Sequence, residues 1–231
     1  MTYLFTPPPV VSVPVTGTTE RFPVHRVYCV GRNYAEHAKE MGFTGREPPF
    51  FFMKPADALL VVEAGQTGTM HYPTLTRDLH HEIELVIAIG KGGKNIPVAE
   101  ALDHVYGFAV GLDMTRRDLQ SDMKKQGRPW CIGKAFEESA PIGPITPATQ
   151  CGDIANAEIS LQVNGQDRQR SHVHNLIWNC AETIAHLSTA WTLQAGDLIF
   201  TGTPEGVAAV VAGDTLHDAV QGLEPLQVRV V

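Results

Sequence analysis

Residues 80–90 read HHEIELVIAIG, and this stretch decides the fold. Its aliphatic residues at 83, 85, 87 and 89 alternate with the residues at 82, 84, 86 and 88. A period of two is typical of a β-strand whose successive side chains point to opposite faces. Glu82 and Glu84 therefore point the same way. By itself this spacing is a weak sign of function, because exposed strand faces often carry acids.

The rest of the chain is rich in strand signals. Strands are predicted at residues 27–30, 50–53, 58–63, 105–112, 198–201 and 226–231, and helices at 33–41, 115–125 and 175–189. Asn164-Gly165, between the runs 159–163 and 166–170, predicts a hairpin because this pair tolerates the positive φ of a tight turn. Strands outnumber helices and do not alternate with them, so we expect a β-rich α+β fold.

The chain divides at residue 25 into a proline-rich arm, residues 1–25, and a domain, residues 26–231. A short strand is expected near residues 10–15 of the arm. We find no signal-peptide pattern and no apolar run as long as a membrane helix. The four cysteines are scattered without a Cys-x-x-Cys pair, which fits a reducing compartment. We therefore expect a cytoplasmic protein.

The formal net charge of −7 argues against a protein that follows nucleic-acid phosphates, because such proteins need clustered Lys and Arg. It does not exclude an anionic substrate. A bound cation and a few local basic side chains decide the potential inside a cleft.

A third carboxylate joins Glu82 and Glu84. Asp113 follows the predicted strand 105–112, and the ends of strands are where functional side chains are often presented. Three converging carboxylates would repel one another without a cation, and three oxygen ligands suit Mg²⁺ or Mn²⁺. His80 and His81 lie beside the acids, where packing or support of the ligands is favoured over ligation.

Other polar residues have two interpretations each. His37 and Glu40 are three apart on a predicted helix, either as a surface pair or as a base held by its carboxylate. Lys134, in WCIGKAF, and Lys54, after FFFM, are either edge residues with buried stems or buried cations facing negative charge. The turn TGTPEG at 201–206 either only reverses the chain or binds a carboxylate.

Five motifs occur together in one chain: NYAEHAKE at 33–40, HEIEL at 81–85, GLDMTRRD at 111–118, WCIGKAF at 130–136 and FTGTPEGV at 200–207. In this order they resemble the fumarylacetoacetate hydrolase superfamily, and within it the small acylpyruvate and fumarylpyruvate hydrolases. The resemblance runs from residue 26 to the C-terminus. It implies a mixed β-sandwich roll, a homodimer, and one Mg²⁺ or Mn²⁺ per subunit.

The resemblance also implies roles for single residues. The metal ligands would be Glu82, Glu84 and Asp113. The catalytic residues would be a His37–Glu40 dyad and Lys134. Substrate would contact Arg117, Gln120 and Thr203, and more loosely Lys54 and Thr201.

The implied activity is hydrolysis of the carbon–carbon bond of a 2,4-diketo acid. Fumarylpyruvate, split to fumarate and pyruvate in aromatic (gentisate) catabolism, is the favoured substrate. The alternatives are an oxaloacetate decarboxylase or an oxo-acid tautomerase, and a non-enzymatic protein with a structural metal. The second carboxylate of a fumaryl group calls for a cation at the far end of the pocket, and Arg32, Lys54 and Arg128 are the candidates.

Overall fold

The computed structural model describes residues 2–35 and 46–231. In this part of the chain the larger sheet has eight strands: β3 (Val27–Gly31), β4 (Phe50–Lys54), β5 (Leu59–Val61), β8 (Ile83–Ile89), β9 (Val105–Leu112), β11 (Ala140–Ile142), β12 (Thr146–Pro147) and β15 (Leu198–Phe200). A second sheet has five: β6 (Thr67–Met70), β13 (Glu158–Val163), β14 (Gln166–His172), β17 (Thr215–Val220) and β18 (Leu226–Val230).

The remaining elements are short. Two small sheets contain β1 (Ser12–Pro14) and β2 (Arg21–Pro23), and β7 (Leu79–His81), β10 (Thr115–Arg116) and β16 (Ala208–Val210). The helices in the described residues are α2 (Arg117–Lys125), α3 (Cys131–Lys134) and α4 (Cys180–Ala190), with 3-10 turns at Ala56–Ala58, Val98–His104, Ile154–Asn156 and Val173–Asn175. None of them is long and apolar enough to cross a membrane.

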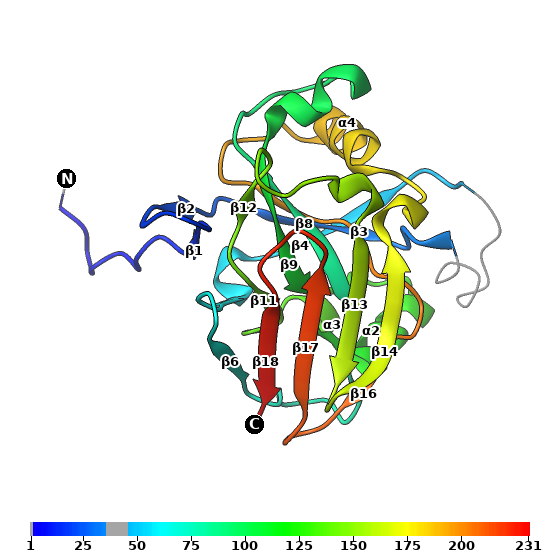
Figure 1. Ribbon diagram of the computed structural model, residues 1–231. Coiled ribbons are helices and arrows are strands. Elements are labelled where there is room, and N and C mark those ends of the chain that lie inside the picture. Colours follow the sequence, from blue (N-terminus) through cyan, green and yellow to red (C-terminus); the bar gives the residue numbers. More distant parts are fainter. Residues whose placement is uncertain (1, 36–45) are drawn as a thin grey trace.

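The five-stranded sheet lies against one face of the larger sheet (Figure 1), and β13 and β17 contact β8 and β9. The alternation in β8 explains this packing. Ile83, Leu85 and Ile87 belong to the main core cluster, which also contains Leu161 and Leu216 of the facing sheet. Parallel and antiparallel pairs occur together, so the predicted mixed, β-rich α+β architecture is confirmed.

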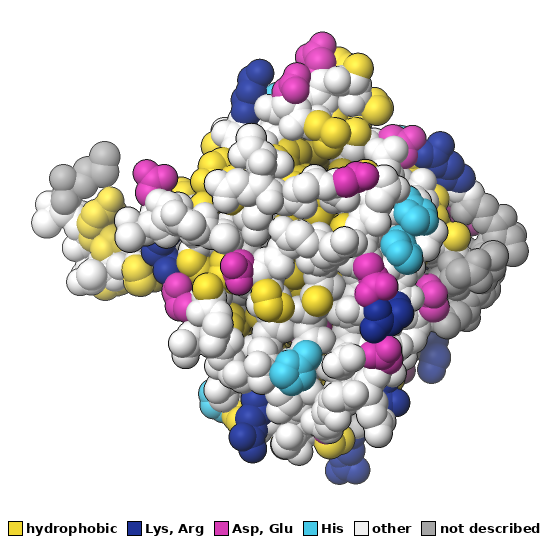
Figure 2. Space-filling view, in the orientation of Figure 1, with side chains coloured by type: hydrophobic (Ala, Val, Ile, Leu, Met, Phe, Trp, Pro, Cys, Tyr) yellow, Lys and Arg dark blue, Asp and Glu magenta, His cyan; other side chains and the backbone are white. Residues whose placement is uncertain are grey.

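The opposite face of β8 supports a second core cluster. Val86 and Ala88 lie there, as the alternation predicts, and they are joined by Val13 and Phe22 of the β1–β2 hairpin. The N-terminal segment therefore covers part of the larger sheet. The outer face of the five-stranded sheet is polar: Figure 2 shows acidic and basic side chains next to one another on it, and Arg170 pairs there with Glu158.

Three predicted boundaries are wrong. The helix predicted at 175–189 begins at Cys180, because Asn179 and Glu182 form a capping box and the backbone N–H of Trp178 is bonded to the side chain of Asn33. The helix predicted at 115–125 begins at Arg117, because the two residues before it pair with β7. The strand predicted at 80–90 is interrupted at Glu82.

Candidate active site

The three predicted carboxylates converge at the interruption between β7 and β8. Glu82 occupies the interruption, Glu84 lies on β8, and Asp113 follows the neighbouring antiparallel strand β9. The backbone N–H of Asp113 donates to the carbonyl of Glu82 at 2.9 Å, which fixes the two strand ends together. All three side chains are buried, and one oxygen from each lies within 4.8 Å of the others.

Two buried lysines face these acids. The Nζ atom of Lys134 lies 2.8 Å from Glu82 Oε2 and 2.6 Å from Asp113 Oδ2, and it donates to the Thr115 hydroxyl at 2.6 Å. The Nζ atom of Lys54 lies 2.8 Å from the other oxygen of Asp113. Both lysines are therefore buried cations facing negative charge, which decides between the two interpretations of the sequence.

The surroundings of Lys134 keep its ammonium charged. Burial lowers the pKa of a lysine, but the nearby carboxylates of Asp113 and Glu82 outweigh burial here and raise the pKa of Lys134. The positive charge therefore stays beside the carboxylates at neutral pH.

The start of α2 adds a third cation. Arg117 pairs with Glu82, and its Nη1 donates to Gln120 Oε1 at 2.6 Å across three residues of the helix. The Nε atom of Arg117 lies 3.4 Å from His80 Nδ1, and the other ring nitrogen of His80 lies 2.9 Å from Asp78. His80 therefore supports Arg117 rather than the carboxylate cluster.

Glu84 has different surroundings from the other two acids. Its Oε2 accepts a hydrogen bond from the backbone N–H of Gly202 at 2.8 Å. Burial, followed by the charges of Asp113 and Glu82, raises the pKa of Glu84 well above its usual value. Gly202 has a φ of +100°, and a Cβ there would lie 2.8 Å from the Cβ of Asn33, so glycine is required for this contact.

This donor set fits a hard divalent cation. Carboxylate oxygens are the ligands that Mg²⁺ and Mn²⁺ prefer, and the three acids converge from rigid strand ends. A cation bound there would favour the ionised form of Glu84, whose charge is otherwise opposed by burial and by two like charges.

The turn after β15 forms another wall. The hydroxyl of Thr201 donates to the carbonyl of Leu85 at 2.9 Å and fixes the turn to β8. The hydroxyl of Thr203 accepts from Gln169 Nε2 at 2.8 Å. Thr203 lines the pocket, whereas Thr201 is fully buried behind it.

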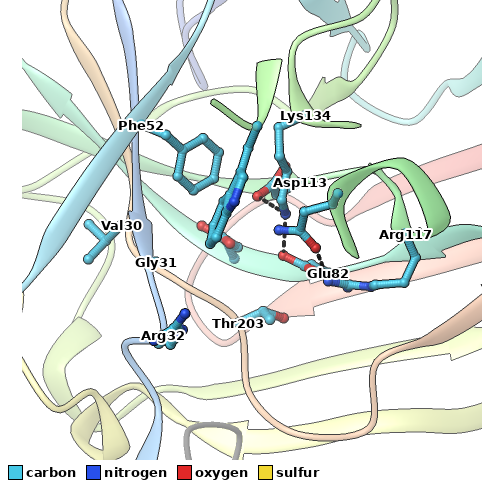
Figure 3. Close-up of a pocket in the computed structure, with 12 residues that line it drawn as sticks. Val30, Gly31, Arg32, Phe52, Glu82, Asp113, Arg117, Lys134 and Thr203 are labelled. Carbon is cyan, nitrogen blue, oxygen red and sulfur yellow. Dashed lines mark hydrogen bonds and ion pairs between the residues drawn. The ribbon is translucent and has the colours of Figure 1, made fainter. Parts of the chain in front are cut away.

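The carboxylates open into a small pocket (Figure 3). It is lined by Val30, Gly31, Arg32, Phe52, Glu82, Glu84, Asp113, Arg117, Gln120, Trp130, Lys134 and Thr203. Arg32 and Arg117 lie on opposite sides of it. Arg32 has a φ of +58°, a conformation that is strained for a residue with a side chain and that often marks a functional position.

The structure separates the predicted site residues into groups. Glu82, Glu84, Asp113 and Lys134 come together with Arg117, Gln120 and Thr203 around the pocket. Lys54 contacts Asp113 from behind, and neither it nor Thr201 lines the pocket, so both hold the wall in place. His37 and Glu40 lie outside the described residues, and their dyad stays a prediction.

Two buried amides were not predicted as site residues. Asn33 donates to the carbonyl of Thr201 at 2.8 Å and to that of Trp178 at 2.9 Å. Gln169 accepts from His81 Nδ1 and contacts the Thr203 turn. Asn33 precedes the predicted dyad in the motif NYAEHAKE, which was a signal. Gln169 stands among exposed polar residues, and only its inward position distinguishes it.

Comparisons with known proteins agree with this geometry. The model of the fumarylacetoacetate (FAA) hydrolase C-terminal family matches residues 26–231. The crystal structure of fumarylpyruvate hydrolase from Pseudomonas aeruginosa in complex with Mn²⁺ and pyruvate is 59% identical, covers 100% of this chain and 99% of that chain, and has a TM-score of 0.97.

Curated relatives extend the comparison. A fumarylpyruvate hydrolase from Ralstonia sp is 48% identical over 80% of this chain and 93% of its own length. A mitochondrial oxaloacetate decarboxylase from Dictyostelium discoideum is 39% identical over 86% of this chain and 90% of its own length.

Proposed function

This chain belongs to the fumarylacetoacetate hydrolase family, and from that premise we propose that it is a metal-dependent hydrolase of acylpyruvates, with fumarylpyruvate as its substrate. The observation that carries the proposal is the buried set of three carboxylates with Lys134 and Arg117 beside a pocket. The relative from Pseudomonas aeruginosa, whose structure contains Mn²⁺ and pyruvate, supports it.

In this proposal Glu82, Glu84 and Asp113 hold one Mg²⁺ or Mn²⁺. The ion would supply Lewis-acid polarisation of the keto and carboxylate oxygens of the pyruvoyl end. Gln120 and Thr203 orient that end through hydrogen bonds, and Arg117 adds positive charge beside it. Lys134 holds a permanent positive charge where negative charge develops on the substrate.

The bond-breaking step needs a base. We assign this role to His37, oriented by Glu40, on the basis of the sequence motif. His37 takes a proton from water as the water oxygen bonds to C4 of the diketo acid. The C3–C4 bond then breaks and leaves its electron pair on the pyruvate enolate, which becomes pyruvate when C3 receives a proton. The acyl part leaves as fumarate.

The fumaryl end carries a second carboxylate, and the structure favours one of the three candidate cations for it. Lys54 is paired with Asp113 behind the pocket. Arg128 is exposed and does not line the pocket. Arg32 lines the side of the pocket opposite Arg117 (Figure 3). We assign the far carboxylate to Arg32.

The direct test uses purified protein with Mn²⁺ and fumarylpyruvate, and equal amounts of pyruvate and fumarate are expected. Arg32→Gln should lower kcat/KM for fumarylpyruvate roughly ten- to a hundredfold, because it removes a charge-assisted hydrogen bond. Its kcat/KM for acetylpyruvate, which lacks the second carboxylate, should be unchanged. Arg128→Gln is the matched control and should affect neither substrate.

Oxaloacetate decarboxylation is the rival activity, favoured by the similarity to the Dictyostelium discoideum enzyme. Release of CO₂ from oxaloacetate without cleavage of either acylpyruvate would contradict the proposed hydrolase. Loss of the enol absorbance of oxaloacetate without CO₂ would instead identify a tautomerase. We further propose that the protein is a cytoplasmic homodimer that acts in aromatic catabolism. Gel filtration would test the dimer, and growth on gentisate would test the role in catabolism.

A further inference from the structure

Gln169 connects the five-stranded sheet to the segment that carries the carboxylates and to the turn that carries Thr203. It lies on β14 and is 1% exposed. Its Oε1 lies 3.0 Å from His81 Nδ1 and 3.1 Å from the backbone nitrogen of Ile83. Its Nε2 lies 2.8 Å from Thr203 Oγ1 and 2.8 Å from the carbonyl oxygen of Pro204. One side chain thus contacts both the segment that carries Glu82 and Glu84 and the turn that carries Thr203.

The backbone fixes which way this amide points. The N–H of Ile83 only donates, so the amide atom that faces it must be the oxygen. The carbonyl of Pro204 only accepts, so the atom that faces it must be the nitrogen. The remaining two contacts then follow: Gln169 donates to the hydroxyl of Thr203 and accepts from Nδ1 of His81.

We propose that Gln169 is a positioning residue that makes Thr203 a hydrogen-bond donor to the bound keto acid. A hydroxyl has one proton, and Gln169 occupies an acceptor site of Thr203 Oγ1. No other hydrogen bond is formed by Oγ1 within residues 2–35 and 46–231. Because Thr203 lines the pocket, its proton is directed to an anionic ligand there. The inference rests on the proposed function insofar as that ligand is a keto acid.

Gln169→Glu tests the direction of the hydrogen bond. Glutamate has nearly the same size but at most one proton to give, and the carbonyl of Pro204, which only accepts, takes that proton. The hydroxyl of Thr203 would turn to donate to residue 169 and would be withdrawn from the ligand. Thr203→Val removes the same donor directly and is the reference for the size of the effect.

The probe is pyruvate, titrated by calorimetry into protein saturated with Mn²⁺. A hydrogen bond to a charged group is lost, so both single variants should bind pyruvate roughly ten- to a hundredfold more weakly. Because both variants remove one donor, the double variant should bind no more weakly than Thr203→Val alone. Gln166→Glu, the same change at an exposed position of β14, should bind pyruvate normally.

Unchanged pyruvate affinity in Gln169→Glu, or additive effects in the double variant, would overturn the role of Gln169. Neutron diffraction of the wild-type pyruvate complex is a second test of the direction of the Thr203 hydroxyl, and it needs no variant. The deuteron on Thr203 Oγ1 should point to the ligand, and a deuteron pointing to Gln169 would overturn the inference. If the wild-type protein with Mn²⁺ bound no pyruvate, both the proposed function and the role of Gln169 would be contradicted. Normal binding by the wild type with unchanged binding by Gln169→Glu would contradict the role of Gln169 alone.

Discussion

Asp113 and Asp218 are equally buried, each 1% exposed, but their surroundings differ. Asp113 lies at the end of β9 between Lys54 and Lys134, with nitrogen–oxygen distances of 2.8 and 2.6 Å. Asp218 lies on β17 between Leu161 and Leu226 of the neighbouring strands. Neither of its oxygens has a hydrogen-bond partner among the described residues.

The comparison shows what burial does to an acid when cations are present and when they are absent. Burial raises the pKa of Asp218 well above its usual value, which favours the neutral form. At the pocket the two lysines compensate the carboxylate charge of Asp113. Cationic partners therefore distinguish Asp113, a proposed metal ligand, from Asp218, whose burial is not compensated by a nearby cation among the described residues.

The largest effect is expected from Asp113→Asn, which removes the charge at the centre of the pocket. It deletes one proposed metal ligand and leaves two buried lysines with one fewer acid. Breaking a buried ion pair from one side costs about 3–5 kcal/mol of unfolding free energy. Hydrolysis should fall at least on the order of a thousandfold, and calorimetry should show no Mn²⁺ binding.

Urea denaturation with and without Mn²⁺ separates the two losses. A metal present at a hundred times its Kd should stabilise the wild-type protein by about 2.7 kcal/mol, and it should not stabilise Asp113→Asn. Asp122→Asn, an exposed acid on α2, is the matched control. Mn²⁺ stabilisation that survives in Asp113→Asn would show that the site does not need this ligand.

A smaller effect should separate the two lysines. Lys134→Met and Lys54→Met each leave Asp113 with one cation and should cost a similar amount of stability, about 3–5 kcal/mol. Only Lys134 lines the pocket, so Lys134→Met should also lower kcat by on the order of 10²–10³. Lys54→Met should retain most of its kcat at temperatures where it is folded.

The exposed pair of Lys125 with Asp122, at 3.8 Å, supplies the control Lys125→Met, which should change neither quantity measurably. Equal loss of kcat in the Lys54 and Lys134 variants would contradict the distinction between a lysine at the pocket and one behind it.

The grouping of the three carboxylates was predictable from the sequence, because side chains alternate strictly along a strand. Glu82 and Glu84 could be placed on one face of residues 80–90, and the antiparallel neighbour then brought Asp113 beside them. The interruption at Glu82 was not predictable, because it depends on β16 and β10 pairing with His81 and its neighbours. Tertiary pairing, rather than local preference, decided where the strand ended.

The position of Gln169 was hidden by a β-bulge. The Asn164-Gly165 turn pairs Val163 with Gln166, and an uninterrupted ladder would then place Arg168 opposite Leu161. The register shifts by one residue between Leu161 and Gln162, so Gln169 takes that inward place. No residue in this segment predicts the bulge. A shift of one residue in the strand register decides which side chain points into the core.

The smallest expected effect, and the only one with the opposite sign, belongs to Asp218→Asn. This change keeps the shape of the side chain and removes a carboxyl group that must stay protonated to remain buried, because it has no partner among the described residues. The variant should be more stable than the wild type at pH 7, by about 1.4 kcal/mol for each pH unit above 3.9 over which folded Asp218 keeps its proton. Urea denaturation measures this, with the exposed Asp103→Asn as a control.

The gain should depend on pH, and the raised pKa of Asp218 sets the direction. In the unfolded chain an aspartate ionises near pH 3.9, whereas in the folded protein Asp218 keeps its proton to higher pH. Unfolding therefore releases a proton above about pH 4, and Asp218 makes the wild type progressively less stable as pH rises from there towards the folded pKa. The stability difference between Asp218→Asn and wild type should thus grow from pH 4 to pH 7. A difference that is constant over this range would contradict the raised pKa of Asp218, because the group would then ionise alike in the folded and the unfolded protein.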